Sequence, residues 1–291
     1  MITKRPGIAA MFMAPALALY ALIVLYPLAT GALLSLTDST VGNGGDFVGL
    51  ANFIELASDP DVLDALRVTV LYAVVVVILQ NAAGLALARA LYRRMRVRRT
   101  FSVLVLLPTL ISAVMAAFIW SYLFAPDGGI NAVLRAVGLQ SLQRVWLGDP
   151  DTALWSIAAV NIWMFAGYSC AIFLAGYLAL PAELLDAAQV DGASSWRQFT
   201  AVEWPLLAPA LTVNVTLALI GCLKVFELPF VMTNGGPAGT TRTLSIIIFE
   251  KIFGGEGNFA YGVAVSLLLL VVVVVLAAST QSLLRRREER I

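Results

Sequence analysis

Residues 181–209 read PAELLDAAQVDGASSWRQFTAVEWPLLAP and form a polar segment between two long apolar segments of the chain. The charged residues of this segment are Glu183, Asp186, Asp191, Arg197 and Glu203. A loop that only joins two membrane helices needs few residues, whereas this one is long enough to fold and to contact a soluble partner. The apolar sequence on both sides of it therefore has to be explained first.

The composition places the chain among membrane proteins. Hydrophobic residues make up 60% of it, charged residues only 13%, and the mean hydropathy is +0.88, all outside the range of soluble globular proteins. Six apolar runs are long enough to cross a bilayer. They cover about 8–36, 65–91, 101–125, 152–178, 207–232 and 259–284. Because lipid satisfies no backbone group, and the alternation of a β-barrel is absent, we predict an all-α integral membrane protein of six helices forming one domain, residues 1–291.

Several classes of function are excluded by what the sequence lacks. There is no histidine, so imidazole ligands, histidine bases and histidine-containing triads are absent. Cys170 and Cys222 both lie in apolar runs, far apart, and predict packing rather than a metal or redox site. No Gly-x-x-x-x-Gly-Lys occurs, so the chain is not expected to hydrolyse ATP, and a net charge of +1 gives no reason to expect nucleic acid. We expect no catalytic residue, metal or cofactor.

The basic residues predict the orientation in the membrane, because cytoplasmic loops carry an excess of Lys and Arg. One set of loops and ends holds twelve of them, the opposite set four. The larger set is Lys4, Arg5, Arg93, Arg94, Arg96, Arg98, Arg99, Arg197, Arg285, Arg286, Arg287 and Arg290, and the smaller set is Arg135, Arg144, Arg242 and Lys251. Both termini and the 181–209 segment are therefore predicted to be cytoplasmic. The first run is longer than a signal peptide's apolar region, so we expect it to be retained as a membrane helix.

The 181–209 segment contains the signals of two short helices. Pro181 is suited to open the first, Glu183 lies in its first turn, where the helix dipole favours an acid, and Gly192 offers a stop. A capping box beginning at Ser195 predicts a second helix that ends before Pro205. The alternative is an amphipathic hairpin on lipid headgroups, but that expects a polar face rich in Lys and Arg, whereas acids dominate here.

These residues resemble the EAA loop of permease subunits of binding-protein-dependent ABC importers. The resemblance is carried by Asp186-Ala187-Ala188, Asp191-Gly192-Ala193, Phe199 and Pro205. Asp186 stands where the family usually has Glu, and residues 202–205 read VEWP where the family has I-x-L-P. The resemblance implies a type I ABC importer permease fold. It also implies that residues 181–206, with Glu183, form a coupling loop that sits in a cleft of a separate ATPase subunit.

Two further motifs resemble the carbohydrate branch of this family. Gly49-Leu50-Ala51-Asn52-Phe53 is similar to its GLxNF motif, and Thr233-Asn234-Gly235-Gly236-Pro237 is similar to its TxGGP turn. The resemblance is to the first permease of maltose- and glycerol-phosphate-type systems. It implies a second homologous permease, two ATP-binding cassette subunits and an extracytoplasmic sugar-binding protein as partners. The location implied is the cytoplasmic (inner) membrane of a bacterium or archaeon.

A substrate pathway is predicted from polar groups within the apolar runs, since such groups are costly in lipid. Asn161, Phe165 and Tyr168 share one helical face, and an amide, an aromatic ring and a phenol suit a sugar. The alternative is that Asn161 and Tyr168 only hydrogen-bond a neighbouring helix. The segment also resembles the sugar-contacting helix of maltose-type permeases, which favours the pathway.

Lys224 and Glu227 add a charged pair, spaced to interact on one helix face about 25 Å along the axis from the start of the fifth run. They either line a watery cavity or extend to the membrane surface. Cys222 aligns by resemblance with a sugar-facing position, although a thiol is a poor ligand for sugars. A phosphorylated substrate would require more positive charge than Lys224 alone.

Two other classes of function compete with the importer hypothesis. A proton- or ion-coupled transporter usually carries several intramembrane acids and inverted repeats, but Glu227 is the one acid well inside an apolar run and no repeat is evident. A membrane-embedded enzyme needs clustered carboxylates or a nucleophile with a base. Asp186 and Asp191 are the nearest candidates, and their spacing places them far apart around a helix. Dependence on a separate ATPase distinguishes all three classes.

Overall fold

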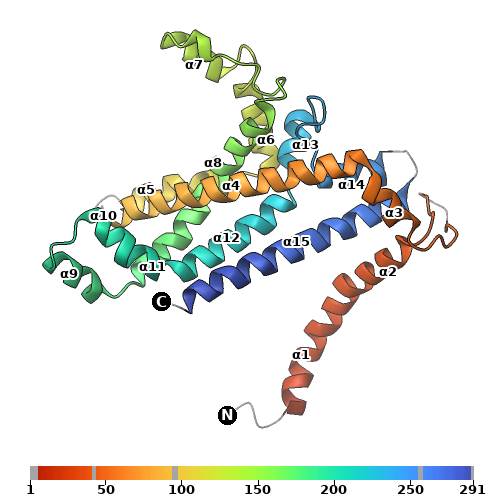
Figure 1. Cartoon of the computed structure of the whole chain (residues 1–291), viewed down its shortest axis with the longest axis horizontal. Coiled ribbons are helices and arrows are strands. Elements are labelled where there is room, and N and C mark those ends of the chain that lie inside the picture. The colour runs from red at the N-terminus through yellow and green to blue at the C-terminus, as the bar shows by residue number, and fades with distance from the viewer. Residues whose placement is uncertain (1–5, 41–43, 94–97, 255–257, 290–291) are drawn as a thin grey trace. The chain divides into compact units, whose positions relative to one another are not determined.

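The computed structural model describes residues 6–40, 44–93, 98–254 and 258–289, and the regular elements among them are helical (Figure 1). The chain groups into two compact units, Met1–Leu63 with Ile247–Leu268, and Asp64–Ile246 with Leu269–Ile291. The boundaries fall within the helices α4 (Pro60–Arg93), α14 (Leu244–Phe253) and α15 (Phe259–Glu288). The expectation of a single membrane domain stays a prediction.

The number of membrane-crossing segments agrees with the six predicted from the sequence. Four helical segments are long and apolar enough to span a bilayer by themselves: Ala10–Leu34, Pro60–Arg93, Ala153–Leu178 and Phe259–Glu288. Two further spans result if each of two bent helix pairs is counted as one: Phe101–Leu110 with Ala113–Leu123, and Ser195–Leu206 with Ala208–Leu223. The all-helical membrane fold predicted from composition is confirmed, and the two bends are new.

The first unit contains the helical run α1 (Pro6–Tyr20), η2 (Ala21–Leu25) and α2 (Tyr26–Leu34), with α3 (Ala51–Ser58), α14 (Leu244–Phe253) and the start of α15. The GLxNF motif has a local structural role here. Gly49 adopts φ +61°, and the Asn52 amide donates to the carbonyls of Ser35 (2.7 Å) and Thr37 (2.8 Å). These carbonyls follow the end of α2, so buried Asn52 supplies partners that the helix no longer provides.

The second unit is organised around Ser169, where three helices meet. Gln80 of α4 donates to the Ser169 hydroxyl (2.9 Å), and Asn214 of α12 (Ala208–Leu223) donates to the Ser169 carbonyl (3.2 Å). Ser169 lies on α8 (Ala153–Leu178), and in Figure 1 α8 crosses behind α4 while α12 runs below it. Gly84 allows the close approach, since a Cβ there would lie 2.5 Å from the Cβ of Ser169. Small residues and interhelical hydrogen bonds are what hold membrane helices together.

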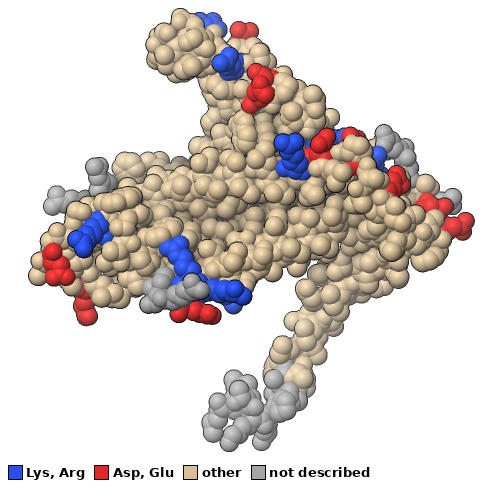
Figure 2. Space-filling model, in the orientation of Figure 1, with Lys and Arg blue, Asp and Glu red and all other residues tan. Residues whose placement is uncertain are grey.

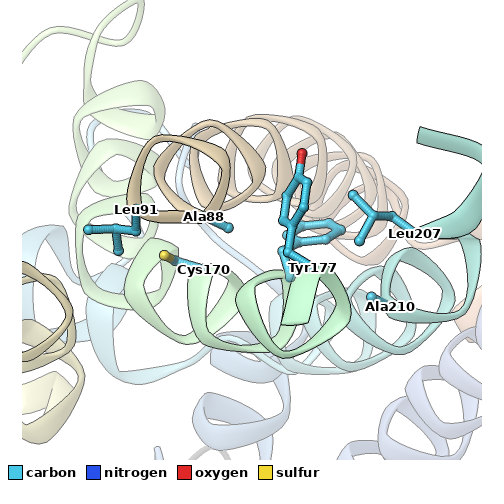
Figure 3. Packing of buried hydrophobic residues seen from close by; sticks show 7 residues of the cluster. Ala88, Leu91, Cys170, Tyr177, Leu207 and Ala210 are labelled. Atoms are coloured by element: carbon cyan, nitrogen blue, oxygen red, sulfur yellow. The ribbon is translucent and has the colours of Figure 1, made fainter. Parts of the chain in front are cut away.

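Between this junction and the 181–206 segment, the same helices pack around an apolar cluster (Figure 3). Figure 3 shows Tyr177 rising from α8 toward α4, with the side chains of residues 207 and 210 beside it. The cluster consists of Ala88, Leu91, Cys170, Phe173, Tyr177, Leu207 and Ala210. Cys170 is buried and unpaired here, as a packing residue.

The predicted span 101–125 is not one straight helix. It divides into α5 (Arg98–Leu106), the 3₁₀ turn η3 (Leu107–Leu110) and α6 (Ala113–Leu123), with a bend of 98°. Pro108 lies in the 3₁₀ turn, and Ser112 begins α6 by accepting a hydrogen bond from the Met115 amide (3.2 Å). Gly167 of α8 permits the bend, because a Cβ there would collide with the carbonyl oxygen of Val105.

The predicted span 207–232 is also interrupted. Helix α12 ends at Leu223, and α13 (Glu227–Thr233) begins after three non-helical residues. The break leaves backbone groups without helical partners, and one of them is satisfied by Thr243, whose hydroxyl donates to the carbonyl of Val225 (3.2 Å). The remaining elements are α7 (Gly129–Ala136), η4 (Gln140–Leu142), α9 (Ala182–Val190), α10 (Ser195–Gln198), η5 (Phe199–Glu203) and α11 (Trp204–Leu206).

The contact at Gly84 yields a prediction about stability. Gly84→Val inserts methyl groups against Ser169 and forces α4 away from α8, which should cost about 1–3 kcal/mol as overpacking does in other tightly packed interiors. We expect a lower melting temperature in detergent for the purified complex. Gly221→Ala in α12 is the control, because open space surrounds Gly221. Equal melting temperatures for the two variants would contradict the close crossing at Ser169.

Candidate functional site

The second unit contains a cavity of about 850 Å³ lined by α4, α5, η3, the first residue of α6, α8, α12, the linker after α12 and the start of α13. Its walls are mainly aliphatic, with a few polar groups among them. All six residues that the sequence analysis assigned to a substrate pathway line it: Asn161, Phe165, Tyr168, Cys222, Lys224 and Glu227. They come from α8, the end of α12, the non-helical linker that follows it and the start of α13, so the chain brings together groups that are far apart in sequence.

Asn161, Phe165 and Tyr168 form a stripe along one face of α8, as their spacing in the sequence predicted. Asn161 is buried at 6% exposure, whereas Phe165 and Tyr168 are considerably exposed and line the same wall. Trp163 lies off the cavity lining, with its ring edge-on to Trp120 at 5.3 Å between centroids. The stripe therefore presents an amide, a phenyl ring and a phenol to one space.

Lys224 and Glu227 line the cavity, but the predicted pairing between them is wrong. Lys224 follows the last residue of α12 and Glu227 is the first of α13, so they do not share a continuous helix face. The described residues include no ion pair between the two. Both side chains are exposed, and Cys222 beside them is buried as a free thiol.

Two cavity residues were missed by the sequence analysis, although the rule that found Asn161 applies to them. Gln80 and Asn214 are amides inside apolar runs, and both line the cavity. Asn214 is only 1% exposed. In the described part of the chain, the Oδ1 atoms of Asn161 and Asn214 have no hydrogen-bond partner, so two buried acceptors are unused beside the cavity.

The segment 181–206 folds as the two-helix element predicted, and its first helix ends as expected. Pro181 precedes α9 and Glu183 lies in the first turn. Gly192 has φ +70°, its amide donates to Gln189 O, and the Ala193 amide donates to Ala188 O, each at 3.0 Å. This double closure is the Schellman motif that glycine favours.

The second helix differs from the prediction in two respects. Its cap is Ser194 rather than Ser195, because the Ser194 hydroxyl accepts from the Arg197 amide (3.3 Å). The helix also does not end before Pro205. It continues through the π-helical turn η5 and through α11, then bends by 68° into α12. A π turn directly before Pro205 widens the helix where the ring would otherwise meet the carbonyl of the preceding turn.

Helix α9 presents acids and apolar side chains to solvent. Glu183, Asp186, Ala187 and Asp191 are exposed, as are Leu184 and Val190. Ala188 and Ala193 are half-buried, and Leu185 is the residue of α9 that is buried. Figure 2 shows charged side chains on the α9–α10 segment beside a wide uncharged surface over the neighbouring helices. Asp186 also lines a pocket of about 440 Å³ shared with α4, α10 and η5.

The most consequential residues that the sequence analysis missed surround Glu203. Its carboxylate, 3% exposed, pairs with Arg89 (Nε to Oε2, 2.9 Å) and Arg93 (Nη2 to Oε1, 3.4 Å) of α4. The Tyr177 hydroxyl of α8 donates to Oε2 (3.1 Å). Phe199, assigned to the coupling loop from sequence, lies under the Arg89 guanidinium at 4.4 Å. An acid among apolar residues at a membrane boundary was the available signal.

No group of three or more His, Cys, Asp or Glu side chains suited to a metal ion occurs among the residues described. The amide and aromatic side chains that line the cavity can form hydrogen bonds and stacking contacts with a ligand.

Comparison with known proteins gives consistent matches over nearly the whole chain. The family described as "Binding-protein-dependent transport system inner membrane component" matches residues 80–289. The probable starch degradation products transport system permease protein AmyD of Thermoanaerobacterium thermosulfurigenes is 31% identical over 258 residues, 89% of this chain and 87% of that protein. The lactose transport system permease protein LacF of Rhizobium radiobacter is 32% identical over 259 residues, 88% and 87% of the two chains.

The fold has a counterpart among solved structures. A chain of a bacterial ABC transporter involved in the import of the acidic polysaccharide alginate superposes with a TM-score of 0.83, at 22% identity, over 98% of this chain and 97% of that one. This similarity agrees with the type I permease fold expected from the EAA-like residues. The family match and these relatives together show that the chain belongs to the binding-protein-dependent transport system inner membrane components.

Proposed function

We propose that this chain is a permease subunit of an ATP-driven importer of neutral carbohydrates, forming half of its translocation pathway. The observation that carries the proposal is the cavity that Asn161, Phe165, Tyr168, Cys222, Lys224 and Glu227 line together. Relatives named for starch degradation products, lactose and trehalose/maltose transport point to the same substrate class.

The cavity chemistry favours a neutral sugar. The unpaired Oδ1 atoms of Asn161 and Asn214 accept hydrogen bonds from hydroxyl groups, and Phe165 and Tyr168 offer ring faces to the apolar side of a pyranose. Lys224 and Glu227 contribute opposite charges, so the lining has no excess of positive charge to attract an acidic or phosphorylated sugar. The TM-score match to an alginate importer concerns the fold and does not extend to its acidic substrate.

We assign the 181–206 segment to coupling with a separate ATPase subunit. Exposed Leu184 and Val190 on α9 provide apolar contact area, and Glu183 and Asp186 provide charge for a complementary cleft. The excess of basic residues in the loops on this side favours a cytoplasmic location for the segment and both termini. The complete importer contains a second homologous permease, two ATP-binding cassette subunits and an extracytoplasmic sugar-binding protein in the cytoplasmic membrane.

The proposed mechanism needs no chemical step in this chain. A loaded binding protein docks on the outer loops, ATP closes the ATPase subunits, and closure moves α9. Helices α8 and α12 flank the segment in the chain, so they move with it and open the cavity outward. Such coupling requires that the ATP-bound and resting states seat α9 differently.

Docking of α9 on the ATPase subunit is tested by cross-linking. Val190, 88% exposed, is replaced by Cys in the assembled importer and treated with a thiol-to-amine cross-linker. We expect a product with the ATPase subunit whose yield changes when ATP is added. The native Cys170 and Cys222 are buried and should not react. The control is Val137→Cys, 62% exposed and in a loop predicted to face outward. Equal yields from positions 190 and 137 would contradict the assignment.

The cavity assignment is tested with two asparagines of equal burial. Asn161→Leu removes an acceptor that lines the cavity, while Asn81→Leu removes an equally buried and equally unpaired acceptor away from it. A net hydrogen bond of about 0.5–1.5 kcal/mol corresponds to a roughly two- to tenfold lower rate of sugar uptake into proteoliposomes for Asn161→Leu. Asn81→Leu should transport at the parental rate once corrected for the amount of assembled complex.

The substrate class is tested in the same vesicles with neutral oligosaccharides and uronate oligosaccharides. We expect uptake of neutral sugars only. Preferential uptake of the uronates, or equal effects of the two asparagine variants, would contradict the proposal.

A further inference from the structure

Glu203 stands out among the described residues as a charged side chain that is almost completely buried. A carboxylate in such a position is costly unless it is paired and hydrogen-bonded. Its two oxygens are occupied by Arg89, Arg93 and Tyr177 at 2.9, 3.4 and 3.1 Å. The cavity mechanism described above does not use any of these four residues.

These four residues, the Glu203 cluster, connect three elements. Arg89 and Arg93 are four residues apart and so share one face of α4. Tyr177 belongs to α8, and Glu203 belongs to the π turn η5. The ring of Tyr177 also stacks on Tyr92 of α4, with 5.1 Å between centroids, so α4 and α8 are joined at this level independently of the carboxylate.

The two arginines hold the 195–203 segment at both of its ends. Besides Glu203, Arg89 donates to the carbonyl of Ser195 (2.7 Å) and Arg93 donates to the Ser195 hydroxyl. Helix α9 packs in turn on α10 and η5, with Leu185 buried. A displacement of α9 therefore reaches α4 through ion pairs and hydrogen bonds centred on Glu203.

The chain itself links the coupling segment to α8 and α12 but not to α4. Residues 179–181 lead from α8 into α9, and Leu207 leads from α11 into α12, whereas α4 ends about a hundred positions earlier in the sequence. Any motion that α4 shares with the segment must pass through non-covalent contacts. Among these contacts, the ion pairs and hydrogen bonds of the Glu203 cluster are charged and are the most directional.

Both helices carry the motion toward the cavity over the same length. Arg89 lies nine residues from Gln80 on α4, and Tyr177 lies nine residues from Tyr168 on α8. At 1.5 Å per residue, each cavity residue is about 14 Å along its helix from the cluster. Because α4 and α8 pack against each other, a displacement of both helices at the Glu203 cluster is passed along them to the cavity, and the two move as a rigid pair.

We propose that Glu203 is a positioning residue that makes α4 move together with the coupling segment, so that displacement of α9 repositions the α4 wall of the cavity along with α8 and α12. This role rests on the proposed function of the 181–206 segment. Without the cluster, α9 still docks and the ATPase subunits still close, but α4 is then linked to the segment only indirectly, through its contacts with α8 at Ser169 and Tyr177. It therefore follows the segment incompletely, and more ATP is hydrolysed for each sugar translocated.

The test uses the full importer in proteoliposomes carrying Glu203→Gln, which keeps the size of the side chain and removes its charge. ATP hydrolysed per sugar transported is measured together with the Val190→Cys cross-link to the ATPase subunit in the same background. We expect the cross-link to be retained and the ATP consumed per sugar to rise about tenfold, the factor that corresponds to one hydrogen-bonded ion pair of moderate strength. The control is Glu289→Gln, an exposed carboxylate of the same predicted side without an ion pair among the described residues.

A second comparison identifies the pairing with α4 as the cause. Arg89→Gln should raise the ATP cost per sugar as Glu203→Gln does, and the double variant should be no worse than either single one, because the two act as one unit. Arg93→Gln provides a milder variant if Glu203→Gln does not assemble, since the Arg93 side chain is 41% exposed and its ion pair is longer.

The outcomes separate this inference from the function on which it rests. An unchanged ATP cost per sugar with the cross-link retained would overturn the role of Glu203 and leave the coupling segment intact. Loss of the cross-link in Glu203→Gln alone would also overturn it, because the cluster would then shape the docking surface only. Absence of the cross-link in the parent Val190→Cys protein would refute the coupling function itself.

Discussion

The absence of hydrogen-bonding partners in lipid is the constraint on which this structure depends. Each place where a membrane helix is interrupted must find partners within the protein. The break after Leu106 is closed by Thr109, whose hydroxyl donates to the Leu106 carbonyl, and by the cap at Ser112. The break after Leu223 is closed in part by Thr243 on the Val225 carbonyl. Interruptions of this kind survive where protein, rather than lipid, surrounds the backbone.

The same constraint explains the position of the cavity. Thr109 and Leu110 from the first break, and Lys224 and Val225 from the second, all line it. The amides of Gln80 on α4 and Asn214 on α12 converge there because both donate to Ser169 of α8, next to the cavity residue Tyr168. In the second unit, the same amide side chains thus line the cavity and hold the helices together. A substitution at Gln80 or Asn214 would consequently affect both, whereas Asn161 does not share the Ser169 contacts and has an unused oxygen beside the cavity.

Much of the fold followed from length and composition, because a bilayer sets the length of each apolar run. The runs 65–91, 152–178 and 259–284 correspond to continuous helices, and Gly192 ends its helix as predicted. The bends were not predictable from hydropathy, since an average over a window does not register a turn at Pro108 or after Leu223. For the same reason Lys224 and Glu227 were wrongly paired across a break. Polarity and helical spacing pointed to five of the pathway residues, and resemblance to the family added Cys222. The pairing of Glu203 with Arg89, by contrast, joins positions more than a hundred residues apart that local patterns do not connect.

The central claim, that the 181–206 segment transmits ATP hydrolysis, is tested most directly by a pair of glycines with the same backbone geometry. Gly192 in the segment and Gly138 in a loop predicted to lie on the opposite side have φ +70° and +79°, and both have open space around them. Substitution by Val strains each backbone by about 1–2 kcal/mol. The measurement is ATP hydrolysis by the reconstituted importer with and without loaded binding protein. We predict that Gly192→Val abolishes the stimulation while Gly138→Val retains it, and equal stimulation of the two variants would contradict the account.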